Sequence, residues 1–295
     1  MKWTFSNVKN MLIHYTDRIL FKYYYRKLVS KRRKTSISDD HSYPVVCLMA
    51  AKSEHFFKKF RRNPTYNDIL EHVSQKQGQD YLDVINQNEE LAFTDADWDN
   101  FIRNDLYGSP AVYSYTIGTR TVEISPTTLR YAKVLQDIAV LFNAHGFRSI
   151  AEIGIGYAGE CRMLTSYFSN IETYSLFDLP EVLALAKRYL GKFGKATIDK
   201  VQFVDGTQID AEGDYDFVIS NYAFSELIRD IQDLYLRNVI LKSKAGYMTW
   251  NTLSHDMLDG YSLEELLKKI PGSSTIAEVP LTKEGNCIIL WGNRR

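Results

Sequence analysis

The chain has 295 residues, 45% of them hydrophobic, which is enough for one large core or two modest ones. Its formal charge is zero, no apolar run reaches the roughly 18–20 residues of a membrane span, and Lys and Arg interrupt the one N-terminal candidate for a signal peptide. Three scattered cysteines show neither metal-ligand nor disulfide spacing, so we expect a protein of the reducing cytoplasm.

The zero net charge hides a basic N-terminal segment. Residues 1–34 carry ten Lys and Arg against one acid, a net charge of +9, which leaves −9 for the rest. Apolar residues spaced by four, three and four predict one face of a helix: Val8, Leu12, Tyr15 and Ile19. We expect residues 1–34 to form a basic amphipathic arm that touches an anionic membrane peripherally. The alternative is a helix packed on its own domain or on a second subunit of a homo-oligomer. Nucleic acid is not expected as a partner, because the remainder is acidic.

Residues 35–124 predict a mostly helical segment that covers a substrate. Residues 35–45 have the composition of a linker, and helical patterns follow, interrupted by Asn63-Pro64. The alternating stretch 113–124 predicts a hairpin around Gly118. Polar residues of these loops are candidates to line a substrate pocket: Tyr107, Ser109, Tyr113, Arg120 and Glu123.

The third segment, residues 125–295, opens with Ser125-Pro126, a helix start, and leads into the stretch 150–179. That stretch predicts a strand, a glycine turn, a helix and a second strand, with a turn of the form G-x-G-x-x-G: Gly154, Gly156 and Gly159. Asp178 ends the second strand 24 residues after Gly154, where a carboxylate meets ribose hydroxyls. The pattern indicates a nucleotide-type cofactor in a doubly wound α/β fold.

Glu152 separates two cofactor classes. Nicotinamide enzymes share the glycine pattern but usually have an apolar residue there, whereas an acid suits a positively charged cofactor. The stretch 152–159 resembles the first motif of class I S-adenosylmethionine methyltransferases. The resemblance implies that Glu152 contacts the methionine part of S-adenosyl-L-methionine and that Asp178 holds its ribose. It also assigns Tyr157, inside the glycine motif, and Leu179, directly after Asp178, to the cofactor site.

Later strands add polar residues at the same sheet edge. Asp205 follows the third strand and, by the resemblance, is the candidate for the adenine amino group; a turn-forming Asp-Gly pair is the equal alternative. The fourth strand ends at Asn221, followed by Tyr222 and Glu226, and Asn251 and His255 follow the fifth. Ligands of this architecture bind outside the carboxyl ends of the strands, so we expect these residues near the transferred methyl group.

A closer resemblance covers roughly 125–291 and rests on EIGIGYAGE, LFDLPEVLALAKRYL, DFVISNYAFSEL and NCIILWG. These stretches resemble sugar O-methyltransferases encoded among bacterial surface-polysaccharide genes. The resemblance implies a Rossmann-like α/β fold with a seven-stranded sheet, and O-methylation of a sugar or glycan hydroxyl on a nucleotide-linked, lipid-linked or polymeric acceptor. The candidate substrate contacts come from the positions given above: Tyr113 and Glu123 in the helical segment, and Tyr222 and Asn251 after the fourth and fifth strands.

A sugar hydroxyl needs a base to take its proton, and His255, Glu226 and Glu123 compete for that role. His255 ranks first because a histidine pKa lies near neutrality. We expect no metal requirement, since no Asp-rich spacing is evident. Three alternatives stay open: a lipid or small-molecule acceptor, a non-catalytic methyltransferase-like subunit, and a nicotinamide dehydrogenase. The last lacks its Tyr-x-x-x-Lys pair after the fourth strand.

Overall fold

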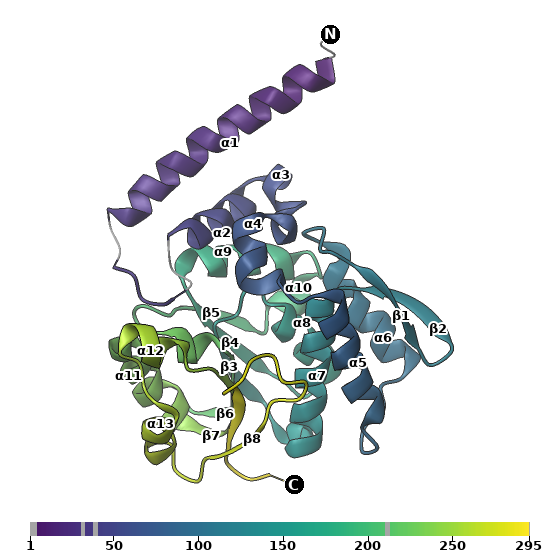
Figure 1. Cartoon of the computed structure of the whole chain (residues 1–295), viewed down its shortest axis with the longest axis vertical. Coiled ribbons are helices and arrows are strands. Elements are labelled where there is room, and N and C mark those ends of the chain that lie inside the picture. Colours follow the sequence, from purple (N-terminus) through teal and green to yellow (C-terminus); the bar gives the residue numbers. More distant parts are fainter. Residues whose placement is uncertain (1–4, 31–32, 38–40, 210–212, 295) are drawn as a thin grey trace.

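The computed structural model describes residues 5–30, 33–37, 41–209 and 213–294 (Figure 1). Its centre is a seven-stranded sheet in the order β5-β4-β3-β6-β7-β9-β8. The first five strands in this order run parallel, and β9 is antiparallel to both of its neighbours. The strands are β3 (Ser149–Ile153), β4 (Thr173–Asp178), β5 (Val201–Asp205), β6 (Tyr215–Asn221), β7 (Ser243–Trp250), β8 (Ser274–Ala277) and β9 (Cys287–Trp291).

The strand order confirms the predicted fold class. Numbered along the chain within this sheet, the order is 3-2-1-4-5-7-6, the seven-stranded arrangement that the class I methyltransferase resemblance implies. The order reverses direction beside β3, and in open α/β sheets ligands bind at such a switch point. The register aligns the carboxyl ends there, with Asp178 opposite Asp205 and Asn221 opposite Thr249.

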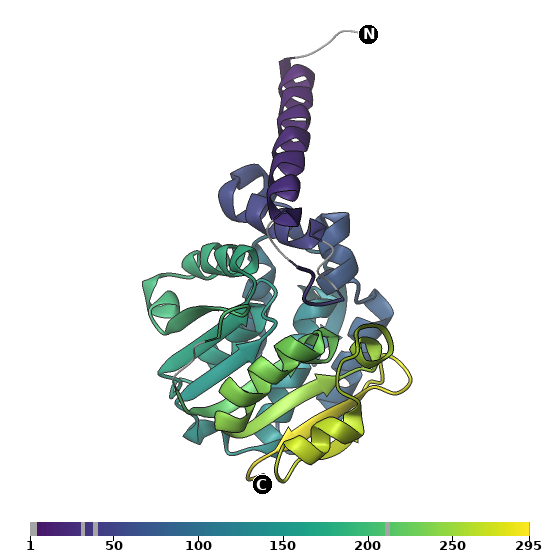
Figure 2. The ribbon, with the colours of Figure 1, turned by 90° about the vertical axis from the view of Figure 1, so that its left-hand side faces the viewer.

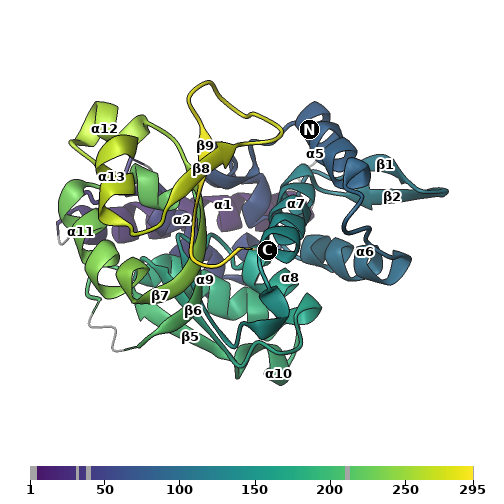
Figure 3. The ribbon, with the colours of Figure 1, turned by 90° about the horizontal axis from the view of Figure 1, so that it is seen from below.

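Two hydrophobic clusters cover the two faces of the sheet. Strand residues such as Ile150 and Phe217 join α7 (Pro126–Leu141), α8 (Gly159–Tyr167) and α9 (Pro180–Gly191) in the larger cluster. The opposite face, including Ile153 and Val218, packs against α11 (Arg229–Asn238) and α13 (Leu263–Lys269). Figure 3 shows the two sets of helices on either side of the strands. The short helices α10 (Lys195–Ile198) and α12 (Leu253–Leu258) lie outside this packing.

The segment before the sheet is mostly helical, as predicted. Its elements are α2 (Ser42–Lys52), α3 (Glu54–Phe57), η1 (Phe60–Arg62), α4 (Pro64–Tyr66), the π-helix η2 (Asn67–Glu71), α5 (Gln75–Gln87), α6 (Asp95–Phe101), η3 (Ile102–Leu106), and the hairpin β1 (Tyr113–Ile117) with β2 (Arg120–Ile124). The predicted linker 35–45 is too long, because α2 already begins at Ser42. Pro44 fits its first turn, where a missing N–H costs nothing.

Buried charge joins these helices to the sheet. The Arg61 guanidinium is fully buried and pairs with Glu71 at 2.5 Å and Asp105 at 2.8 Å. It also donates to the hydroxyl of Ser125, the residue that caps α7. Residues from α2 and α5 share the larger hydrophobic cluster with the sheet. The division at residues 34 and 124 stays a prediction, and the two later segments have a continuous core.

The N-terminal helix α1 (Phe5–Val29) stands away from the body of the molecule (Figures 1 and 2). Its later part touches α2 and α3: Lys52 of α2 lies 5.0 Å from the centroid of the Tyr24 ring, and His55 of α3 lies 3.7 Å from the Asp17 carboxylate. Ile19 is 51% exposed. Val8, Leu12 and Tyr15 were predicted to share one helix face with Ile19, and their side chains lie outside the described set. Lys31 and Arg32 lie outside the described residues altogether. Among the described residues, no helix is long and apolar enough to cross a membrane.

Candidate functional site

The turn after β3 has the backbone that its glycines predict. Gly154 and Gly156 have φ values of +76° and +53°, in the left-handed region that glycine tolerates. A Cβ at Gly154 would collide with the Cβ of Ala223, and one at Gly156 would lie 2.9 Å from Leu70. Both positions therefore require glycine for conformation and for close approach.

Asp178 fixes this turn to the neighbouring strand. Its carboxylate accepts hydrogen bonds from the backbone N–H of Ile155 at 2.9 Å and of Leu179 at 2.7 Å. The backbone N–H of Gly154 also donates to the carbonyl of Phe177. The acid that the sequence assigns to a ribose is thus held at the base of the turn.

A cavity of about 760 Å³ opens above these strand ends. Such a volume lies within the usual range for ligand sites, roughly 300–1,000 Å³, and has room for a cofactor and part of an acceptor. Eight of the predicted residues line it: Gly154, Gly156, Asp178, Leu179, Asn221, Tyr222, Glu226 and Asn251. The carboxyl ends of four parallel strands therefore converge on one space, as predicted from the sequence.

Asp205 is not among the residues that line the cavity, and its carboxylate forms the turn that was the alternative to adenine contact. The Asp205 carboxylate accepts from the N–H of Thr207 at 2.9 Å and from its hydroxyl at 2.7 Å. Gly206 and Thr207 line the cavity instead. A Cβ at Gly206 would meet the Tyr235 hydroxyl and approach the Asp178 backbone to 3.3 Å, so the floor here is backbone.

Glu152 lies beneath the cavity and is not one of its lining residues. It is 4% exposed and accepts a hydrogen bond from the Tyr174 hydroxyl at 2.7 Å. Burial raises the pKa of Glu152 to about 8, despite the opposing effect of Tyr174. Glu160 is buried beside it, with both carboxylate oxygens lacking a hydrogen-bond partner, and burial and Glu152 raise its pKa. A pair of buried acids was not expected from the sequence.

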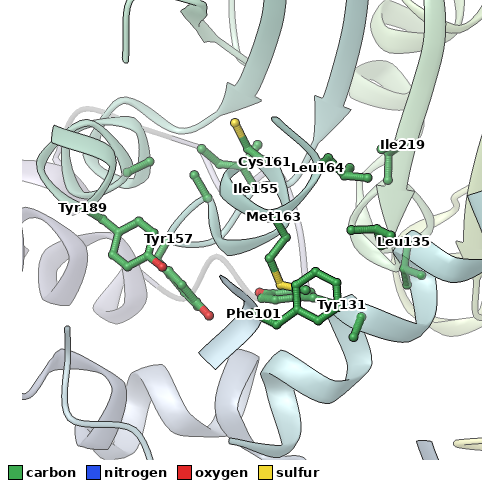
Figure 4. Packing of buried hydrophobic residues seen from close by; sticks show 14 of the residues in the cluster. Phe101, Tyr131, Leu135, Ile155, Tyr157, Cys161, Met163, Leu164, Tyr189 and Ile219 are labelled. Carbon is green, nitrogen blue, oxygen red and sulfur yellow. The ribbon is translucent and has the colours of Figure 1, made fainter. Parts of the chain in front are cut away.

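Neither Tyr157 nor Gly159 is among the residues that line the cavity. The fully buried Tyr157 ring lies against the Tyr189 ring, with 4.8 Å between the ring centroids (Figure 4). The Arg61 guanidinium lies over the Tyr157 ring, 4.6 Å from its centroid. A Cβ at Gly159 would lie 2.6 Å from the Tyr157 ring and 2.7 Å from Tyr131. Their predicted contact with the cofactor is therefore corrected to a packing role under the turn.

On the other half of the cavity, polar groups are fixed by one another. Asn251 donates to Glu226 at 3.1 Å and is itself held by its backbone bond to the Ser225 hydroxyl. Tyr222 has a φ of 65°, a sparsely populated conformation for a residue with a side chain. Its hydroxyl donates to Glu278, whose carboxylate also binds Thr282. This half presents acids, amides and hydroxyls.

Three further predicted residues lie outside the cavity. His255 is exposed on α12, with Nδ1 3.3 Å from the carbonyl of Gly260, and is not among the lining residues, so the structure does not place it beside the other candidates. Tyr113 and Glu123 lie on the β1–β2 hairpin, which extends beyond α6 in Figure 1. The other loop candidates are also placed elsewhere: Tyr107 packs on Phe193, Arg120 pairs with Asp99, and Ser109 accepts from Arg62 through its carbonyl.

Sequence reasoning missed His72 and Arg130, which both line the cavity. His72 follows η2, and burial together with the charge of Arg130 lowers its pKa, so the imidazole is neutral at neutral pH. Arg130 lies in the second turn of α7, the helix whose start was predicted at Ser125-Pro126. Among the described residues no cluster of three or more His, Cys, Asp or Glu could hold a metal, and metal independence stays a prediction.

The residues present fit S-adenosylmethionine. The glycine turn lets a ligand approach the main chain. Asp178 lines the cavity at the sequence position where a carboxylate meets ribose hydroxyls, and the turn after β5 offers backbone groups. The half of the cavity formed by the glycine turn and Asp178 can hold a nucleoside. The half formed by Tyr222, Glu226 and Asn251 can orient a hydroxyl.

No protein-family model and no curated protein sequence matches the chain. Several solved structures have a similar arrangement. Mitomycin 7-O-methyltransferase MmcR is 16% identical, over 56% of this chain and 54% of MmcR, with a TM-score of 0.42. The pyocyanin biosynthetic protein PhzM is 13% identical over 56% of each chain, with a TM-score of 0.41. M. capricolum TrmK, solved with S-adenosyl-homocysteine, is 15% identical over 55% of this chain and 66% of its own, with a TM-score of 0.36.

This chain covers only about half of the first of these structures.

Proposed function

We propose that the protein is an S-adenosylmethionine-dependent O-methyltransferase that acts on a sugar or glycan hydroxyl in surface-polysaccharide synthesis. The observation that supports it most is the cavity, where the glycine turn and Asp178 form one half and the fixed polar groups of Tyr222, Glu226 and Asn251 form the other. The sugar acceptor rests on the resemblance of residues 125–291.

In this proposal the backbone of the glycine turn, Asp178 and the turn at Gly206 hold the cofactor. When bound, adenosylmethionine supplies a methyl group activated by a sulfonium. The protein contributes mainly position, since orienting two reactants can provide roughly 7–11 kcal/mol of the barrier in ideal systems. Tyr222 and Asn251 orient the acceptor at the ends of β6 and β7.

Glu226 takes the proton of the acceptor hydroxyl. Asn251 holds its carboxylate in one orientation, which a general base requires. His72 is the second candidate because it faces the same cavity and is neutral at neutral pH. A positioned base typically contributes about 10²–10⁴-fold to the rate. Glu226→Gln should therefore reduce kcat by that factor and leave cofactor affinity unchanged.

Calorimetric titration with S-adenosylhomocysteine and NADH tests the cofactor. We expect the wild type to bind the sulfur nucleoside and not NADH. Asp178→Ala should weaken binding strongly, whereas Asp199→Ala, a change at an exposed acid outside the cavity, should not. No binding of S-adenosylhomocysteine to folded wild-type protein would refute the methyltransferase. If it binds, a panel of sugars and sugar nucleotides with labelled cofactor tests the acceptor.

We also propose that the arm touches an anionic membrane surface, which would bring the enzyme to a lipid-linked acceptor. Ile19 and Tyr23 of α1 are more than half exposed, and Lys22 and Arg26 lie one turn apart beside them. Each cation near such a surface adds about 1 kcal/mol. Flotation with phosphatidylserine vesicles should be lost for Lys22→Glu/Arg26→Glu and kept for Lys58→Glu/Lys59→Glu, a matched exposed pair on the body. Flotation that depends on neither pair would refute this contact.

A further inference from the structure

Arg130 is a partly buried cation that lines the cavity and has no ion-pair partner among the described residues. Its Nη2 donates to the carbonyl of Leu70 at 3.3 Å, while its Nε is buried and has no hydrogen-bond partner. Within the described ranges, no Asp or Glu forms an ion pair with it. The neighbouring cations are satisfied: Arg61 pairs with two carboxylates, and Lys133 pairs with Asp137 at 2.6 Å.

Such a group is costly to keep. A buried charge normally requires a partner, and a buried N–H donor left unpaired carries its full desolvation penalty. Among the acids nearby, Glu71 binds Arg61 and Glu278 binds Tyr222 and Thr282. Glu160 interacts electrostatically with Arg130 but forms no hydrogen bond with it. The Arg130 charge acts on His72, whose pKa it lowers in addition to the effect of burial. A ligand anion would supply what the chain leaves out.

The position of Arg130 along the sheet edge indicates which anion comes first. Asp178 and Gly206, at the ends of β4 and β5, mark the nucleoside end of the cavity. Leu70, which accepts from Arg130, packs over Gly156 beyond β3. A smaller adjoining pocket places Arg130 with Asn221 and Tyr222 at the end of β6. In the strand order β5-β4-β3-β6, a ligand with its nucleoside at β4 extends its tail toward Arg130.

We propose that Arg130 is the anion-binding residue of this cavity and takes a carboxylate there, in the first place that of the amino-acid tail of adenosylmethionine. An acidic acceptor, such as a uronic acid, presents the same group and is the second source. The inference rests on the proposed cofactor. It assigns Arg130 as a positioning residue, because the tail it fixes determines where the sulfonium lies.

The test compares two nucleosides that differ in the tail. S-adenosylhomocysteine carries the carboxylate, and 5′-methylthioadenosine lacks it. Arg130→Gln should weaken S-adenosylhomocysteine by about 10-fold or more, the usual loss of a charge-assisted hydrogen bond, and leave methylthioadenosine unchanged. Arg130→Lys keeps the charge and should lose less. Arg120→Gln, at an exposed arginine of the hairpin, is the matched control, and methylthioadenosine binding confirms that each variant is folded.

Each other outcome has a meaning. Equal weakening of both nucleosides would overturn the proposal, because Arg130 would then only support the Leu70 segment. If neither is weakened, the acceptor arm decides: D-glucuronate is added to wild type and Arg130→Gln saturated with S-adenosylhomocysteine, and chemical-shift changes are recorded with D-glucose as control. A response to glucuronate alone that Arg130→Gln removes assigns the anion to the acceptor, and no such response overturns the proposal. Wild type that binds neither nucleoside refutes the proposed cofactor itself.

Discussion

The buried carboxyl of Glu152 should make the stability of the protein depend on pH in a direction opposite to that of most acids. Folding raises its pKa from 4.5 to about 8 through burial. Between these values the folded chain holds a proton that the unfolded chain has lost, so the free energy of unfolding falls as pH rises. At ~1.4 kcal/mol per pKa unit, the loss reaches about 5 kcal/mol by pH 8 to 9.

Glu152→Gln removes this titration and keeps an oxygen that accepts from Tyr174. At pH 5 we expect the variant and the wild type to have similar stability. By pH 8.5 the variant should be the more stable by several kcal/mol, on the order of the loss given above. Glu160 titrates in the same direction, and removing the Glu152 charge also removes one of the two effects that raise its pKa, so the difference between the proteins reports the loss of Glu152 and of its coupling to Glu160.

Urea unfolding followed by tryptophan fluorescence at pH 5, 7 and 8.5 gives the three free energies needed. Glu89→Gln, at an exposed acid, is the matched control and should follow the wild type at every pH. If the difference between Glu152→Gln and wild type is the same at all three pH values, Glu152 does not carry a raised pKa and the argument from burial fails.

Two further substitutions test the turn and the buried cation below it. Gly154→Ala places a residue with a side chain at a left-handed φ, where its Cβ collides with Ala223, so it should abolish S-adenosylhomocysteine binding and lower the free energy of unfolding by roughly 3 kcal/mol or more in thermal unfolding. The control Gly118→Ala is also at positive φ but has open space around it, and it should cost only about 1 kcal/mol. Equal losses in the two variants would exclude the collision. Arg61→Ala should destabilise by about 3–5 kcal/mol, because Glu71 and Asp105 keep buried charges without a partner, whereas the exposed Arg62→Ala should be nearly neutral; a mild Arg61→Ala would mean that these acids find water.

The sequence was informative wherever a local pattern fixes local geometry. A glycine motif, a strand-terminal acid and a proline after a capping serine each define a backbone shape within a few residues. The turn at Gly154, the place of Asp178 at the end of its strand, and the start of α7 at Pro126 were therefore predictable. The parallel order of the strands then brought Asn221 and Asn251 to the same edge.

The same reasoning failed where a side chain has to choose a direction. Tyr157 lies inside the motif yet turns under it, and His255 follows the correct strand yet lies on the exposed side of a short helix. Arg130 and His72 reach the cavity only because the helices before the sheet fold over its edge. That placement depends on contacts between residues far apart in the chain, such as Arg61 with Asp105, which no local pattern encodes.

The short stretch after the N-terminal helix determines which N-terminal truncations leave the cavity intact. Thr35 and Ile37 form backbone hydrogen bonds with the loop that carries Glu226: Ile37 donates to the Glu226 carbonyl at 2.9 Å, and Ile228 donates to the Thr35 carbonyl at 3.0 Å. Ser36 completes an antiparallel bridge with Leu227, and all three residues line the cavity. A fragment that begins at residue 35 keeps this bridge and its hydrogen bonds, whereas one that begins at residue 41 loses part of the cavity wall. Shortened versions for crystallisation or acceptor screening should therefore start before Thr35.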